Sequence, residues 1–162
     1  AFGLSEGAGA CFGEAKDFIA RYFAAYPRLK RYLEEVKERA REQGYAETIF
    51  GRRRPIAELL SSMPAVRAAG ERMAINMPIQ GTAADVLKLA MIEVEAKLPE
   101  WSSTAKMVLQ VHDELVFEVL EEEVRTLAPK LQTCMETVAN IGVKLSVGAK
   151  AGKDWEHLED IG

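Results

Sequence analysis

Apolar residues recur at helical spacing in several segments of the first two thirds of the chain. Aromatic residues in segment 14–26 share one predicted helix face, and the pattern resumes after Pro27 and ends near Gly44. Because proline is welcome at a helix start, this predicts two helices or one kinked helix. A third helix is predicted over about 65–98, with a kink where Pro78 removes one backbone donor.

Elsewhere the period of the pattern is that of strands. Segment 45–50 is rich in aromatic and β-branched residues and predicts a strand that leads into a basic turn at 51–55. Alternation over 107–119 predicts a hairpin with a His-Asp pair near its tip. An amphipathic helix is predicted over 121–139, and alternation over 143–147 predicts a last strand. This order predicts an α+β fold, an antiparallel sheet with helices on one face.

Composition agrees with an ordinary folded protein. The chain has 162 residues, of which 48% are hydrophobic and 28% charged, within the range of a globular domain. No run approaches the roughly 18 apolar residues of a membrane span, and the first residues lack the features of a signal peptide, so we expect no membrane partner and a cytoplasmic location. Because the first residue is alanine, we expect a fragment or a processed chain.

Charge is divided unevenly along the sequence. Residues 28–72 contain 11 Lys and Arg against 7 Asp and Glu, a balance of +4, whereas residues 93–162 contain 7 against 14, a balance of −7. This asymmetry indicates a basic face for a polyanion and an acidic part that holds cations. Charged helix faces in contact with water are the alternative explanation.

Three long polar side chains share a spacing within the predicted third helix. Arg72, Asn76 and Gln80 stand at i, i+4 and i+8, which places them within about 80° of one another around an α-helix. The rest of this segment is largely apolar, so the spacing predicts a stripe of hydrogen-bond donors. On its own, the stripe is better explained as a solvated face.

The sequence His112-Asp113-Glu114 is the strongest candidate for chemistry. Two adjacent carboxylates at a hairpin tip suit a hard cation such as Mg²⁺, which takes one or two carboxylates together with phosphate oxygens of a substrate. A simple acidic turn is the alternative. The two cysteines lack metal-like spacing, and neither a nucleophile elbow nor a glycine-rich phosphate loop is present in the sequence.

Several motifs together resemble one known family. Residues 71–85, ERMAINMPIQGTAAD, and residues 110–118, QVHDELVFE, resemble the C-terminal part of family A DNA polymerases, the bacterial DNA polymerase I type. The motifs YF-x-x-YP at 22–27, QGY-x-ET at 43–48 and GRR at 51–53 follow in the order typical of that family, as does the G-x-x-W around Trp155. The resemblance covers essentially the whole chain.

The resemblance implies template-directed nucleotidyl transfer to a primer 3′-hydroxyl by two-metal catalysis, in DNA replication and repair. It implies two Mg²⁺ ions in the complete active site, Asp113 as a metal ligand and Glu114 as a supporting catalytic carboxylate. His112 is implied to face the primer terminus. Asn76 and Gln80 are implied to lie along the template and the new base pair, where side-chain donors can meet minor-groove acceptors, and Arg72 is implied to support the DNA contact. We expect four further arginines to contact duplex phosphates, namely Arg52, Arg53, Arg54 and Arg67.

The same resemblance predicts a division of the chain. Residues 1–64 are expected to form distal fingers helices with a basic hairpin, and residues 65–162 the C-terminal half of the palm. The family's other catalytic aspartate and the fingers helix that grips the triphosphate are not in this sequence. We therefore expect the chain to be inactive alone and to need upstream polymerase segments as partners, besides primer-template duplex DNA and deoxynucleotide triphosphates. The implied location is the nucleoid.

Two other functions remain open at this stage. A noncatalytic DNA-binding module would keep the duplex-facing residues, but it would gain nothing from carboxylates beside phosphates. A stand-alone metal-dependent nuclease would need more acidic ligands than Asp113 and Glu114 supply, and Asp85 lies too far along its predicted helix to add one.

Overall fold

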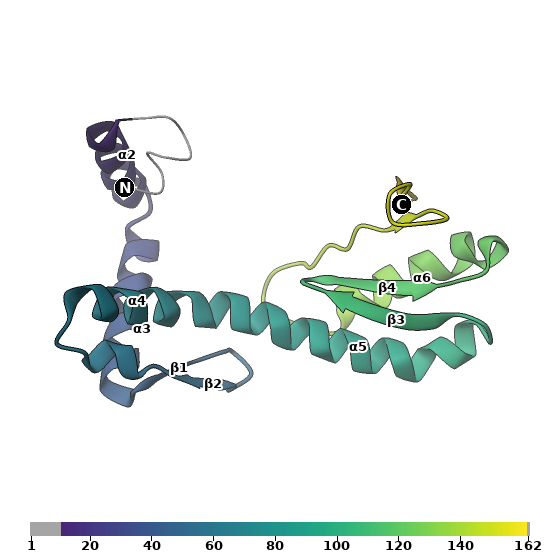
Figure 1. Ribbon diagram of the computed structural model, residues 1–162, viewed down its shortest axis with the longest axis horizontal. Helices are drawn as coiled ribbons and strands as arrows, with labels where there is room; N and C mark the ends of the chain where they lie inside the picture. Colours follow the sequence, from purple (N-terminus) through teal and green to yellow (C-terminus); the bar gives the residue numbers. More distant parts are fainter. Residues whose placement is uncertain (1–10, 162) are drawn as a thin grey trace. The chain divides into compact units, whose positions relative to one another are not determined.

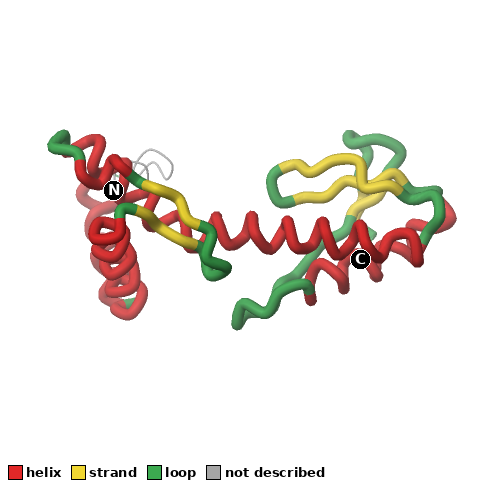
Figure 2. The backbone as a smooth tube through the Cα atoms, turned by 90° about the horizontal axis from the view of Figure 1, so that it is seen from below, coloured by secondary structure: helices red, strands yellow, loops and turns green. Residues whose placement is uncertain are grey.

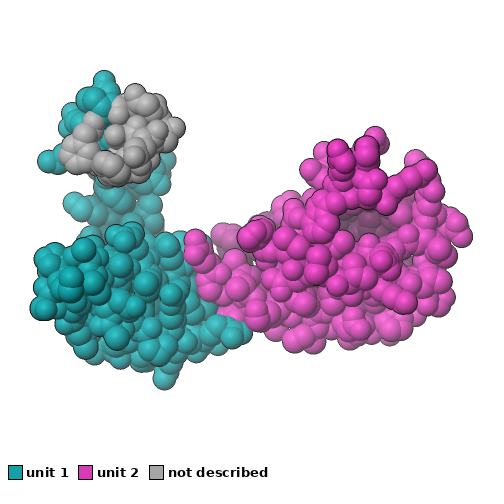
Figure 3. Space-filling model, in the orientation of Figure 1, with its two compact units in different colours: residues 1–79 teal, residues 80–162 magenta. Residues whose placement is uncertain are grey.

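The computed structural model describes residues 11–161. Most of the N-terminal segment, in which we found no features of a signal peptide, lies outside the described residues. The chain divides into two compact units, residues 1–79 and residues 80–162, which Figure 3 draws in teal and magenta. Both helices and antiparallel strands are present, which confirms the predicted α+β class. None of the described helices is long and apolar enough to cross a bilayer.

The first unit begins with two helices, α2 (Phe12–Ala25) and α3 (Pro27–Gln43). Proline occupies the first position of α3, where its missing donor costs nothing, so the chain forms two helices rather than one kinked helix. Helix α3 ends as predicted at Gly44, whose φ of 77° is a left-handed conformation that glycine adopts without strain.

A short hairpin follows, formed by β1 (Tyr45–Glu47) and β2 (Arg53–Pro55). The predicted strand 45–50 is therefore too long. The predicted basic turn 51–55 is partly wrong, because Arg53 and Arg54 belong to the second strand. The reason lies in Thr48, whose hydroxyl oxygen accepts hydrogen bonds from the amides of Phe50 and Arg52 at 3.3 and 3.2 Å. These bonds close the turn immediately after Glu47.

The rest of the first unit is helical, with η1 (Ala57–Leu60) leading into α4 (Pro64–Asn76). Its core gathers side chains from α3, β1, η1, α4 and the residue after α4 around the fully buried Ile56, namely Ala40, Ala46, Leu59, Ala74 and Met77. Gly70 allows α4 to approach η1 closely, because a Cβ at this position would stand 2.9 Å from the amide nitrogen of Leu59.

The predicted third helix is divided into parts of different geometry. Helix α4 is followed by the π-helical segment η2 (Met77–Gly81) and then by α5 (Thr82–Trp101). Pro78 lies within η2, so the chain accommodates the proline by a wider helical turn at the predicted position. In α5 the apolar residues Leu87, Met91, Val94 and Leu98 are buried or half-buried, and the helix ends at Trp101.

The second unit combines α5 with a hairpin and a further helix. Strands β3 (Lys106–Val111) and β4 (Glu114–Glu118) pair antiparallel, as predicted, with an irregularity between Met107 and Leu109. The segment η3 (Glu121–Glu123) leads into α6 (Val124–Thr137). Helices α5 and α6 pack against each other beside the hairpin, as Figures 1 and 2 show.

The predicted last strand over 143–147 is wrong. No ladder includes this segment in the part of the chain that the structure describes, and the strands there form three separate two-stranded ladders, not one continuous sheet. Instead, side chains of α6 bind the main chain of Val147: Gln132 Nε2 donates to its carbonyl at 2.9 Å, and its amide donates to Glu136 at 3.0 Å. The third ladder joins β5 (Lys150–Ala151) and β6 (Glu159–Asp160).

Candidate nucleic-acid and metal site

The turn between β3 and β4 holds the predicted acidic pair at the end of a defined hairpin. Val111 and Glu114 are paired across the strands, which leaves His112 and Asp113 as a two-residue turn. His112 has a φ of 52°, a left-handed conformation of the kind that favoured hairpin turns require. The turn therefore fixes where the two carboxylates leave the backbone.

Gln110 lies near the end of β3, just before the turn, and the sequence did not predict a role for its side chain. Its side-chain amide donates a hydrogen bond of 3.0 Å to the carbonyl oxygen of His112. The bond bridges the turn from the strand that precedes it, so Gln110 acts as a positioning residue for the acidic pair.

Asp113 and Glu114 are both exposed, which suits a cation that also contacts other molecules. Among residues 11–161, no three side chains of His, Cys, Asp or Glu converge into a complete metal site. Magnesium takes one or two protein carboxylates and completes its shell with waters and substrate phosphates. The donor set at the turn therefore fits an ion that shares its ligands with substrate or with other segments of protein.

Other polar groups of this unit are occupied in structural roles. Ser102 and Thr104 both donate to Glu123 Oε2, at 2.6 and 2.9 Å, and the amide of Ala105 donates to Ser102 Oγ at 2.9 Å. This network ties the end of α5 to the start of α6. Asp85 is only 5% exposed within α5 and has its own partner, unlike the exposed carboxylates of the acidic pair.

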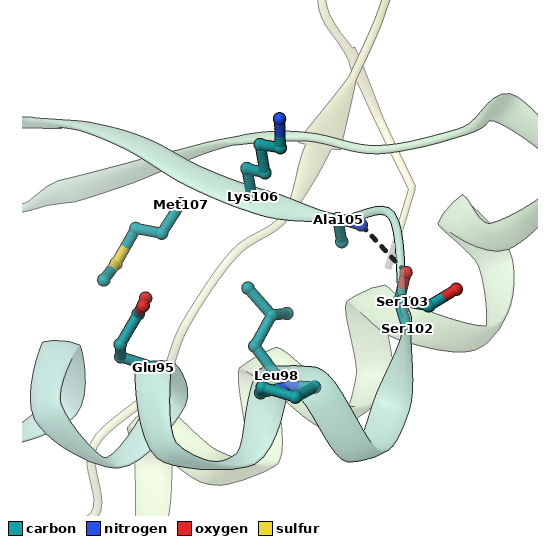
Figure 4. A pocket seen from close by; sticks show the side chains of 8 residues that line it. Glu95, Leu98, Ser102, Ser103, Ala105, Lys106 and Met107 are labelled. Carbon is teal, nitrogen blue, oxygen red and sulfur yellow. Dashed lines mark hydrogen bonds between the residues drawn. The ribbon is translucent and has the colours of Figure 1, made fainter.

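A cavity of about 340 Å³ lies between the end of α5 and the beginning of β3 (Figure 4). Glu95 points from the helix towards the strand, Met107 points from the strand towards the helix, and Lys106 points away from the cavity. Because the cavity borders the start of β3, it lies at the opposite end of that strand from the turn. It therefore has no part in positioning the acidic pair.

The predicted arginines of the first unit differ in what they contact. Arg53 lies over the Tyr45 ring, 4.6 Å from its centroid, and its Nε is 3.4 Å from Glu47. Arg52 and Arg54, the neighbours of Arg53 in the chain, are exposed. The hairpin thus presents consecutive cations on a short, paired segment.

Arg67 differs from these three because it is half-buried. Its guanidinium donates to the carbonyl oxygen of Ser61 at 3.1 Å, a bond that holds the loop before α4. Its position therefore has a structural role besides any contact with nucleic acid.

The predicted donor stripe is only partly contained in one regular helix. Arg72 and Asn76 are exposed and one turn apart in α4, on the same face. Gln80 is also exposed but belongs to the π-helical segment η2. Its place relative to the other two does not follow from α-helical spacing.

Comparison with known proteins identifies relatives along nearly all of the chain. The family model for DNA polymerase family A matches residues 1–157. DNA polymerase I of Pseudomonas aeruginosa is 45% identical over 157 residues, which are 97% of this chain. The thermostable DNA polymerase I of Thermus aquaticus is 45% identical over 144 residues, which are 89% of it. In both cases the chain spans 17% of the relative's length.

A solved structure matches the fold as well. The POL domain of Pol1 from M. smegmatis, in complex with DNA primer-template and dNTP, superposes with a TM-score of 0.81 at 40% sequence identity. The match covers 90% of this chain and 26% of that one. The described fold is thus that of one part of such a domain.

Proposed function

Because the chain belongs to DNA polymerase family A, we propose that it forms part of a DNA-directed DNA polymerase. The reaction would be template-directed transfer of a deoxynucleotide to a primer 3′-hydroxyl, in replication or repair of DNA. The observation that carries the proposal is the exposed Asp113-Glu114 pair on a fixed turn, in a chain that matches the family over residues 1–157. Such a function would place the protein at the nucleoid.

The proposal assigns parts of the chain to parts of a polymerase. Residues 1–64 would form distal fingers helices with the basic hairpin, and residues 65–162 would form the C-terminal half of the palm. The chain spans only 17% of its relatives' length, so other segments would complete the active site. We therefore propose that the chain is inactive until those upstream segments join it.

The acidic turn would serve the chemical step. Asp113 would hold Mg²⁺, with Glu114 as a second carboxylate close by, and His112 would face the primer terminus. The chemistry supplied by the bound ions is stabilisation of the attacking and leaving oxygens of an in-line displacement. The exposure of both carboxylates supports this role, because substrate phosphates must reach the same cation.

Basic and amide side chains of the chain would bind the primer-template. Arg52, Arg53, Arg54, Arg67 and Arg72 would contact phosphates, which fixes the position of the duplex without reading its sequence. Asn76 and Gln80 would donate to minor-groove acceptors. All four kinds of base pair present acceptors there, so a donor can test the shape of a pair without preferring one sequence.

A noncatalytic DNA-binding module is the second candidate. The basic balance of +4 over residues 28–72 favours it to the same degree as it favours a polymerase. The two candidates differ in the role of the acidic turn. In a module that only binds DNA, carboxylates beside phosphates weaken binding and serve no purpose.

Primer extension with Mg²⁺ and all four deoxynucleotide triphosphates tests the proposal. The chain is assayed alone and then with a family A segment that supplies the upstream palm and fingers. We expect extension only in the mixture, its loss in Asp113→Ala, and unchanged extension in Glu118→Ala, an exposed carboxylate of the same hairpin. Asp113→Ala should leave duplex binding intact or stronger, because one repulsive charge is removed.

Three results would contradict parts of the proposal. Extension by the chain alone would contradict the need for upstream segments. A collapse of duplex binding in Asp113→Ala would contradict the metal-binding role of Asp113. Association with the upstream segment without any extension would favour the DNA-binding module.

A further inference from the structure

The tip of the β1–β2 hairpin presents two large apolar side chains to solvent. Ile49 is 61% exposed and Phe50 is 46% exposed, although both follow Thr48, which is only 4% exposed. The turn forms the free end of the β1–β2 hairpin (Figure 1). An exposed aromatic beside an exposed aliphatic side chain is the composition of a contact surface, not of a solvated turn.

The backbone of this tip is held in one conformation. Besides the two amides bound by Thr48 Oγ1, the amide of Gly51 donates to the carbonyl of Thr48 at 3.0 Å, and the amide of Thr48 donates to the carbonyl of Arg52 at 3.0 Å. Gly51 has a φ of 81°, which a side chain would strain. A turn fixed in this way presents Phe50 with little ordering left to lose on binding.

The charge around the tip selects the kind of partner. Three consecutive arginines, residues 52–54, follow Phe50 after Gly51, and Arg53 is already stacked over Tyr45. Ile49 also lines a groove of about 380 Å³ whose wall carries further aromatic and polar side chains, among them Tyr32, Arg39, Gln43 and Tyr45. Aromatic rings beside a line of cations are the features with which proteins bind unpaired nucleic acid.

We propose that Phe50, supported by Ile49, stacks on an unpaired base of a nucleic-acid strand whose phosphates are bound by Arg52, Arg53 and Arg54. The inference rests on the proposed DNA-binding function and adds a site for the single-stranded part of the substrate. An unpaired strand is the occupant that fits, because bases within a duplex are already stacked and offer no free face to the ring.

Fluorescence anisotropy with two matched probes tests the inference. Each probe is a labelled hairpin duplex with a 5′ overhang, which carries thymidines in one probe and abasic sites in the other. We expect the chain to bind the thymidine overhang about tenfold more tightly, in line with the cost of removing one stacked base. Phe50→Ala should abolish this difference, and Phe50→Trp should retain it because an aromatic ring remains.

Leu60→Ala is the matched control, since Leu60 is 74% exposed in η1 of the same unit and lies outside the tip. It should behave as the parent chain does, and circular dichroism checks that all variants fold. An equal loss of affinity for both probes in Phe50→Ala would overturn the inference. So would a parent chain that self-associates through Phe50 and binds both probes alike.

Failure of the underlying function gives a different result. If the parent chain binds neither probe nor a blunt duplex, the proposed DNA contact itself is wrong, and the base-stacking site falls with it. If the parent chain binds the blunt duplex and both overhang probes equally, only the stacking site is wrong.

Discussion

The Gln110 side chain and the His112 carbonyl oxygen are joined by a hydrogen bond of 3.0 Å across the tip of the β3–β4 hairpin. His112 has a positive φ of 52°, and it is the only described residue other than glycine with this backbone geometry. A bond from the preceding strand offsets part of the cost of that conformation. The acidic pair therefore follows a turn that is stabilised from within its own hairpin.

Replacement of His112 by a β-branched residue should destabilise the second unit. In the left-handed region an L side chain costs about 1–2 kcal/mol, and the cost is highest for β-branched residues. We expect His112→Val to lower the free energy of unfolding by about that amount in urea titrations. His112→Asn should be nearly neutral, because asparagine tolerates the conformation. Equal stability of the two variants would contradict a left-handed backbone conformation at residue 112.

Addition of a single methyl group at Gly70 should also be costly. Its Cβ would lie 2.9 Å from the Leu59 nitrogen and 3.0 Å from the Glu58 carbonyl carbon, and backbone atoms cannot give way as a side chain does. We expect Gly70→Ala to destabilise the first unit by about 1–3 kcal/mol, the usual cost of overpacking. Gly148→Ala is the control, because its Cβ would meet nothing within 4 Å. Thermal unfolding of both variants checks the difference.

The salt dependence of duplex binding should report the contact made by Arg54. Each phosphate contact contributes a slope of about −0.9 to the dependence of log K on log salt concentration. We expect Arg54→Ala to make the measured slope less negative by about that amount, with a similar effect on duplexes of different sequence. Arg125→Ala, which removes an exposed cation from α6 in the acidic part of the chain, should leave the slope unchanged. An unchanged slope in Arg54→Ala would remove this residue from the DNA interface.

The two cysteines should differ in reactivity and in their effect on stability. Burial in α6 raises the pKa of the Cys134 thiol, whereas Cys11 is exposed at the start of α2. Because the unfolded thiol loses its proton near its ordinary pKa of about 8.5, the folded state binds more protons above that pH. Stability should therefore fall as the pH rises from about 8.5 towards the raised pKa of folded Cys134.

Unfolding measured against pH in Cys134→Ala checks this expectation, since the variant should lose that part of the alkaline dependence. Thiol labelling of the folded chain should modify Cys11 first. Fast labelling of Cys134 under native conditions would contradict its burial.

Sequence reasoning succeeded where a pattern repeats over several turns or where one residue has few conformational choices. The helices around Val36, Val94 and Leu127 follow from apolar spacing, and all three side chains are buried. The two-residue turn at His112 follows from alternation on both sides of a pair that tolerates positive φ. These features depend on local geometry, which the order of residues carries directly.

It failed where partners distant in sequence or single side-chain bonds decide the result. The alternation of Val143, Leu145 and Val147 is typical of a strand, but α6 binds the Val147 main chain instead. Thr48 ends β1 early through one hydroxyl, a bond that β propensity does not reveal. For the candidate site, the acidic pair was visible in the sequence, whereas the supporting bond from Gln110 was not.

All three described ladders join strands that are close neighbours in the chain. Strands β3 and β4 are separated by two residues in the chain, and strands β1 and β2 are linked by residues 48–52. The strands of each hairpin can therefore pair without first closing a long loop. Hairpin formation of this kind takes about 1–10 μs. The strand pairing of this chain is therefore local, and it does not wait for residues from distant parts of the sequence to come together.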